Sequence, residues 1–266
     1  MTSNFLDTKE ITYIWPIRSP KTNKAVEKTI KTKEKSGLIT KILEVQHPSF
    51  TVYKPTVKGN NIGIIICPGG GYNLLAIDLE GVEVAQWLIK LGYTVFLLKY
   101  CVPNKEFEAL NDLKRTIRII RSKAKKYKIN KNQIGVLGFS AGGSLCAKVS
   151  TLFNKETYTK VDETDAVSCR PNFTLLIYPA YLDQGENNSI TPEIKINKNT
   201  PPMFVFGTSD DIYGNSCLVI TKALKDAQVP VELHFLDEGG HGYGLRKGNE
   251  AAEAWPKLAE NWLKKI

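Results

Sequence analysis

The sequence predicts a single α/β domain in which helices cover both faces of a mostly parallel β-sheet. Strand-like apolar segments alternate with helical patterns from about residue 50 to the C-terminus. The segments 62–67 (IGIIIC) and 94–98 (TVFLL) are almost wholly apolar, as strands covered on both faces must be. Parallel neighbours also require crossover connections, and the segments between these strands carry helical patterns that can supply them.

The predicted elements follow in chain order. Short runs rich in β-branched and aromatic residues predict strands at 50–53, 62–67, 94–99, 133–137, 173–178, 203–206 and 231–236. Apolar residues spaced three and four apart predict helices at 82–91, 109–127, 141–152, 215–228 and 250–265. The segment 185–202, rich in Pro, Asn and Lys, is interpreted as a long excursion within the domain.

Composition excludes several classes of protein. Hydrophobic residues make up 42% and charged residues 24% of the 266 positions, which fits neither a disordered nor a fibrous chain. No apolar run approaches the roughly 20 residues of a membrane helix, so we expect no membrane partner. The opening segment MTSNFLDTKE lacks the apolar stretch of a secretory signal. We expect a cytoplasmic protein, or a secreted or periplasmic one if a leader has been removed.

The net charge of +9 raises nucleic acid as a partner, but its distribution argues against one. The excess lies in residues 1–60 and 105–131, and in the second segment apolar positions recur at helical spacing. We therefore interpret its basic residues as the solvated face of an amphipathic helix. Residues 1–35 are expected to be a polar segment, flexible or part of the same domain, and 36–266 the main α/β domain.

The five cysteines are scattered, and no two form a CxxC pair. We expect buried thiols rather than disulfides or metal ligands, and no metal site or cofactor.

A candidate nucleophile follows the strand at 133–137. Residues 138–143 read GFSAGG and lead directly into a helix, which is the G-x-S-x-G nucleophile elbow with Ser140 at its centre. The alternative is a glycine-rich turn in which Ser140 caps the helix. After the strand at 62–67, the loop PGGGY carries three glycines whose N–H groups could hold an oxyanion. That loop lacks the spacing of a phosphate-binding loop, although an ordinary loop remains an alternative.

A serine nucleophile needs a base and an acid that orients the base. His241 is the candidate base, because it lies between two glycine pairs after the last strand, whereas His47 and His234 fit structural roles. The acid is expected after the strand at 203–206. Asp210 is preferred as the first acidic residue beyond that strand, with Asp211 in reserve. The order Ser, Asp, His is that of α/β-hydrolases.

These motifs resemble the α/β-hydrolase superfamily, and within it the bacterial esterases labelled acetyl xylan esterase or xylanase-like. The resemblance spans most of the chain and rests on ITYIWP, HPSFTVYKP, CPGGGY, LEGVEVAQWLIKLGY, LLKYCVP, RTIRIIRSKAKKY, IGVLGFSAGGSLCAK, TLLIYPAY, PPMFVFGTSDD and VPVELHFLDEGGHGYGL. It implies the α/β-hydrolase fold and catalytic roles for Ser140, Asp210 and His241. It also implies an oxyanion hole from the backbone of Gly70, Gly71 and Ala141, and Tyr72 is expected to bind substrate.

The resemblance implies a serine esterase that removes acetyl or other small acyl groups from carbohydrate, without a cofactor. Three features depart from the group: Cys101 in place of an arginine, Ser144 in place of a histidine, and a short stretch at 211–215. Two other functions stay open: a peptidase of the prolyl oligopeptidase type, and a binding protein without catalysis. The intact Ser, Asp and His argue against the second.

Overall fold

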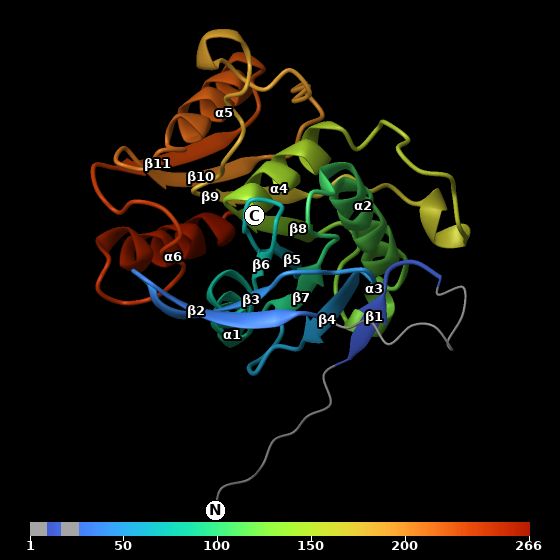
Figure 1. Cartoon of the computed structure of the whole chain (residues 1–266). Coiled ribbons are helices and arrows are strands. Elements are labelled where there is room, and N and C mark those ends of the chain that lie inside the picture. The colour runs from blue at the N-terminus through green and yellow to red at the C-terminus, as the bar shows by residue number, and fades with distance from the viewer. Residues whose placement is uncertain (1–9, 17–26) are drawn as a thin grey trace, which may run out of the picture.

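A computed structural model describes residues 10–16 and 27–266. Within them, an eight-stranded sheet forms the centre of the molecule (Figure 1). Its strands, in order across the sheet, are β1 (Ile11–Tyr13), β4 (Ser49–Tyr53), β7 (Thr94–Lys99), β5 (Gly63–Cys67), β8 (Ile134–Phe139), β9 (Phe173–Ile177), β10 (Met203–Thr208) and β11 (Val231–Leu236). The pairs β1–β4 and β4–β7 are antiparallel, and all other pairs are parallel. The predicted mostly parallel α/β fold is confirmed.

Helices cover both faces of this sheet. Apolar residues of α1 (Glu83–Lys90) and α6 (Glu250–Leu263) pack against one face. Those of α2 (Glu106–Ser122), α3 (Ala124–Tyr127), α4 (Ala141–Thr151) and α5 (Asn215–Asp226) pack against the other. None of the described helices combines the length and the apolar character that crossing a bilayer requires.

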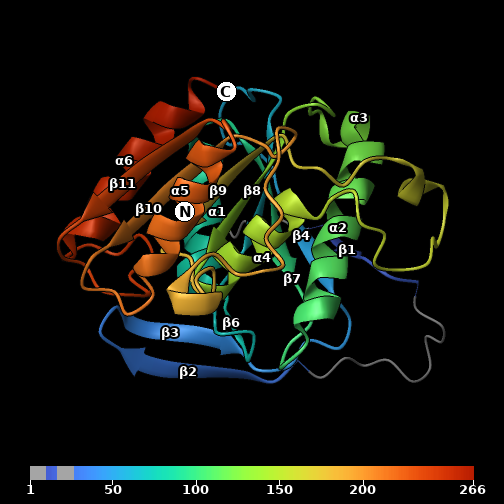
Figure 2. The same ribbon diagram turned by 90° about the horizontal axis from the view of Figure 1, so that it is seen from above.

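All seven predicted strands lie in the main sheet, and four further strands have no counterpart in the sequence prediction. One of these is β1; the others, β2 (Thr29–Glu34), β3 (Gly37–Ile42) and β6 (Leu75–Ala76), form a small antiparallel sheet. Figure 2 shows the β2–β3 hairpin as a separate ribbon beside β6. The turn of this hairpin includes residue 35, the last residue of the polar segment expected at 1–35.

Arg246 attaches the hairpin to the rest of the molecule. Its guanidinium pairs with the Glu83 carboxylate at 2.6 Å and donates to the carbonyl oxygens of Ser36 and Leu38, both at 2.8 Å. The Ser36 hydroxyl donates to the carbonyl of Gly242, next to the candidate base, at 2.8 Å. The hairpin is therefore tied to the loop that carries His241.

Helix α2 differs from the solvated basic face expected from its sequence. Its apolar positions are buried as predicted, but Lys114 and Arg115 are also buried, with exposed fractions of 1% and 3%. Arg115 pairs with Asp162 and Asp165, each at 2.6 Å. A long connection between α4 and β9 covers this side of the helix, which a helical periodicity cannot reveal. The five cysteines are buried and free, as predicted.

Asp112 of α2 is a buried acid away from the candidate site. Its carboxylate accepts hydrogen bonds from the Trp15 indole N–H at 2.6 Å and from the backbone N–H of Cys101 at 2.9 Å. Burial outweighs these bonds and raises the pKa of Asp112 from 3.8 to about 6.

This shift predicts a pH-dependent stability. Between pH 3.8 and about 6 the folded protein binds more protons at Asp112 than the unfolded chain does, so the free energy of unfolding falls as the pH rises. Because of Asp112, the free energy of unfolding falls by about 3 kcal/mol across this range, at 1.36 kcal/mol for each unit of pKa. We expect Asp112→Asn to flatten the pH dependence, as measured by urea unfolding from pH 4 to 7. An unchanged slope in the variant would contradict the assignment.

Candidate active site

Ser140 lies at the sharp turn between β8 and α4. Its backbone adopts φ 51° and ψ −120°, outside the conformations that L-residues favour. The two glycines that frame it allow close backbone approach: a Cβ on Gly138 would lie 2.1 Å from the Gly142 carbonyl, and one on Gly142 would lie 2.1 Å from the Cys67 carbonyl. The motif therefore forms the strained elbow expected of a nucleophile, and the Ser140 side chain does not cap α4.

His241 connects Ser140 to an acid. The Ser140 Oγ lies 2.8 Å from His241 Nε2, and the Asp211 Oδ2 lies 2.7 Å from His241 Nδ1. The Asp211 side chain is 1% exposed and that of His241 27% exposed, so the acid is buried while the base reaches the solvent-accessible side. An imidazole held between a hydroxyl and a buried carboxylate can accept a proton from the hydroxyl.

Asp210, the acid preferred from the sequence, does not contact His241. Its two carboxylate oxygens accept the backbone N–H groups of Gly239 and Gly240 at 3.2 and 2.8 Å. These bonds lower the pKa of Asp210, and the bond from Gly240 has the largest effect. The preference is corrected because consecutive side chains point in different directions: Asp211 turns inward, and Asp210 stays exposed and fixes the loop before His241.

The loop between β5 and β6 (residues 68–74), the candidate oxyanion loop, lies beside Ser140. Gly70 and Gly71 line the same cavity as Ser140 and His241. Among the described residues, no hydrogen-bond acceptor in the protein pairs with the N–H groups of Gly70, Gly71 or Ala141. Free N–H groups next to a nucleophile are what stabilisation of a tetrahedral oxyanion requires.

The cavity at Ser140 has a volume of about 270 Å³. Aromatic side chains form one of its walls: Tyr213 packs against His241 with ring centroids 4.9 Å apart, and Tyr181 packs against Tyr213 at 5.4 Å. The hairpin closes another side through Glu34, Ile39 and Lys41.

Tyr72, expected to bind substrate, does not line this cavity. It is 2% exposed and lies beneath Tyr181, with the two rings stacked at 6.3 Å. Its position is corrected to the core, where it supports the wall that Tyr181 presents. Cys101 and Ser144, which depart from the esterase pattern, are also buried and do not line the cavity.

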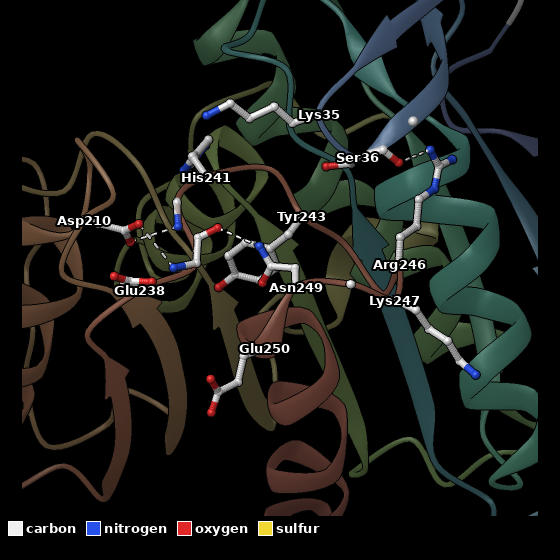
Figure 3. A pocket seen from close by; sticks show the side chains of 14 residues that line it. Lys35, Ser36, Asp210, Glu238, His241, Tyr243, Arg246, Lys247, Asn249 and Glu250 are labelled. Carbon is white, nitrogen blue, oxygen red and sulfur yellow. Dashed lines mark hydrogen bonds between the residues drawn. The ribbon is translucent and has the colours of Figure 1, made fainter.

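A second cavity of about 730 Å³ shares His241 with the first (Figure 3). Charged side chains of both signs line it, including those of Lys35, Asp210, Glu238 and Lys247. Figure 3 shows Asp210 and Glu238 on one side of this space, Lys35 above His241, and Arg246 and Lys247 on the opposite side. The lining therefore offers both hydrogen-bond donors and acceptors.

Known proteins similar to this chain are hydrolases and esterases. A family model described as BD-FAE matches residues 50–176. A solved acetyl ester-xyloside bifunctional hydrolase from Caldicellulosiruptor lactoaceticus is 32% identical, with a TM-score of 0.76 over 97% of this chain and 96% of that one. MGS-M1, an α/β hydrolase from a Medee basin deep-sea metagenome library, is 27% identical, with a TM-score of 0.67 over 90% and 97%. The chain belongs to the α/β-hydrolase superfamily.

A curated relative of this hydrolase-superfamily chain is an acetylxylan esterase of Xylanibacter ruminicola. It is 27% identical over 230 residues, which cover 76% of this chain and 45% of the relative. The chain thus spans less than half the length of that protein.

Proposed function

We propose that this chain is a serine esterase that removes small acyl groups, chiefly acetyl, from carbohydrate. The observation that carries the proposal is the hydrogen-bonded series Ser140, His241 and Asp211 next to the unpaired N–H groups of the oxyanion loop. The similarity to an acetyl ester-xyloside hydrolase and to an acetylxylan esterase supports the substrate class.

The reaction proceeds in two halves. Ser140 Oγ attacks the ester carbonyl carbon while its proton passes to His241 Nε2, and Asp211 stabilises the imidazolium through Nδ1. The backbone N–H groups of the oxyanion hole bind the carbonyl oxygen as it becomes negative. The sugar hydroxyl leaves with the proton from His241. Water then attacks the acyl-enzyme, with His241 again acting first as base and then as acid.

The two cavities suit the two parts of such a substrate. The smaller one next to Ser140 has room for a short acyl group, and the tyrosine wall offers faces for a sugar ring. The larger one supplies charged and amide groups that can bond to sugar hydroxyls. We assign the acyl group to the first cavity and the saccharide to the region where both meet at His241.

A substrate panel tests the proposed function. We expect kcat/KM for acetylated xylo-oligosaccharides to exceed that for p-nitrophenyl butyrate by about tenfold or more, equivalent to about 1.4 kcal/mol of transition-state binding. Acetate release is measured by titration at constant pH, and deacetylated oligosaccharide serves as the blank. Faster cleavage of proline amides than of any ester would favour the peptidase, and no turnover of any ester would favour the binding protein.

A further inference from the structure

Glu80 is a buried carboxylic acid that the esterase chemistry above does not use. It lies in the π-helix η1 (Asp78–Val82) and is 3% exposed. Single π-helical turns are rare in proteins, and those that do occur are often found at functional sites. Its Oε2 accepts the backbone N–H of Gly69 at 2.7 Å, and its Oε1 accepts the Tyr178 hydroxyl at 2.9 Å.

The first of these bonds holds the oxyanion loop. Gly69 directly precedes Gly70 and Gly71 and packs against the elbow: a Cβ built on Gly69 would lie 2.8 Å from the Ser140 Cβ and 2.8 Å from Glu80 Oε2. The neighbouring carbonyl of Pro68 accepts the Tyr100 hydroxyl at 2.6 Å. The start of the loop is therefore fixed by hydrogen bonds on two consecutive residues.

The second bond continues to the loop of the base. The Tyr178 hydroxyl accepts the backbone N–H of Gly244 at 3.1 Å, three residues after His241. The Tyr178 ring also packs edge-on against the imidazole of His241, with centroids 5.1 Å apart. One carboxyl group thus connects, through one tyrosine, the loop of the oxyanion hole with the loop of the base.

We propose that Glu80 is a positioning residue that holds the oxyanion loop and the His241 loop in their reactive arrangement. An ionised carboxylate satisfies both donors at once. Burial acts against this ionisation and raises the pKa of Glu80, while the bonds from Gly69 and Tyr178 favour it. The other titratable groups that act on it are Tyr100, His241 and Glu34, and Lys41 lines the same cavity.

Glu80→Gln tests the proposal, which rests on the esterase function proposed above. The amide keeps the shape of the side chain, but its NH₂ group cannot accept a hydrogen bond, so one of the two donors loses its acceptor. A shift of about 1 Å in a catalytic group can cost about 10²-fold. We expect kcat for p-nitrophenyl acetate to fall by about 10- to 100-fold, with KM changed by less than about threefold.

Two further variants distinguish positioning from a purely structural role. Tyr178→Phe removes the hydroxyl that links Glu80 to the backbone of Gly244. This variant tests the same connection if Glu80→Gln does not fold. If both residues act as one connection, the double variant loses little more kcat than the worse single variant. Asp112→Asn is the matched control. Like Glu80, Asp112 is a buried carboxyl group that accepts one backbone N–H and one side-chain donor, in this case the Trp15 indole N–H, and we expect the kcat of the variant to stay within about twofold.

The outcomes separate this proposal from the proposed function. If the wild type hydrolyses esters and Glu80→Gln retains kcat within about twofold, only the role of Glu80 is overturned. Losses that multiply in the double variant, or an equal loss in Asp112→Asn, overturn it as well. If wild type and Ser140→Ala hydrolyse esters equally slowly, both proposals fail.

Discussion

Ser140→Ala is expected to lower kcat/KM for p-nitrophenyl acetate by about 10⁴-fold or more. The variant removes the oxygen that lies 2.8 Å from His241 Nε2, and no acyl-enzyme can then form. Loss of a triad serine leaves only the rate enhancement supplied by binding and by the oxyanion hole. Stopped-flow or fixed-time absorbance assays measure the loss, and a fluorophosphonate probe should label the wild type but not the variant.

Ser209→Ala is the matched control for this experiment. Ser209 lies in the loop that carries the acid, but its hydroxyl donates to the Asp237 carbonyl at 2.8 Å and does not contact His241. We expect its activity to remain within a few-fold of the wild type. If Ser140→Ala retained turnover comparable to Ser209→Ala, Ser140 would not be the nucleophile.

Asp211→Asn is expected to lower kcat by about 10⁴-fold, whereas Asp210→Asn lowers it by less than about tenfold. The amide at position 211 can donate to Nδ1 and favour the tautomer that carries its proton on Nε2, which cannot accept the serine proton. At position 210 the amide oxygen still accepts one of the two glycine N–H groups. Steady-state kinetics of the two variants give the comparison directly.

This pair also tests which aspartate orients the base. Both variants change one carboxylate to an amide in the same loop, so they alter the net charge equally. Thermal unfolding of both checks that the loop remains folded. A larger loss of kcat in Asp210→Asn than in Asp211→Asn would reverse the assignment made from the geometry.

The main sheet could be predicted closely because its strands carry a local signal. A strand buried on both faces has an apolar run, and the predicted bounds 94–99 are those of β7. The edge strand β11 is only partly buried, and its alternating pattern predicted its bounds 231–236. The elbow also carries a local signal in its G-x-S-x-G pattern, although only Gly138 is required by a contact within the turn; Gly142 is required by its close approach to the carbonyl of Cys67 at the end of β5. The position of the base followed from its place after the last strand.

Features that depend on contacts between residues far apart in the sequence were not predicted. The β2–β3 hairpin is polar and carries no strand run of its own; its position depends on β6 and on the bonds from Arg246. Tyr178 and Tyr213 could have been noticed as aromatic residues just beyond strand β9 and in the acid loop. Glu80 has no such signal, because its partners are 11 and 98 positions away along the chain.

By itself, the sequence predicted seven strands of the main sheet, the helices that cover it, and Ser140 and His241 as candidate nucleophile and base, because most of the signal for each lies in residues close together in the chain. Only the tertiary structure showed that Asp211 rather than Asp210 contacts His241, that Tyr72 lies in the core rather than in the cavity, and that charged residues of α2 are buried. These features depend on the direction in which a side chain points and on what covers it. Both are set by packing between segments that the chain order does not bring together.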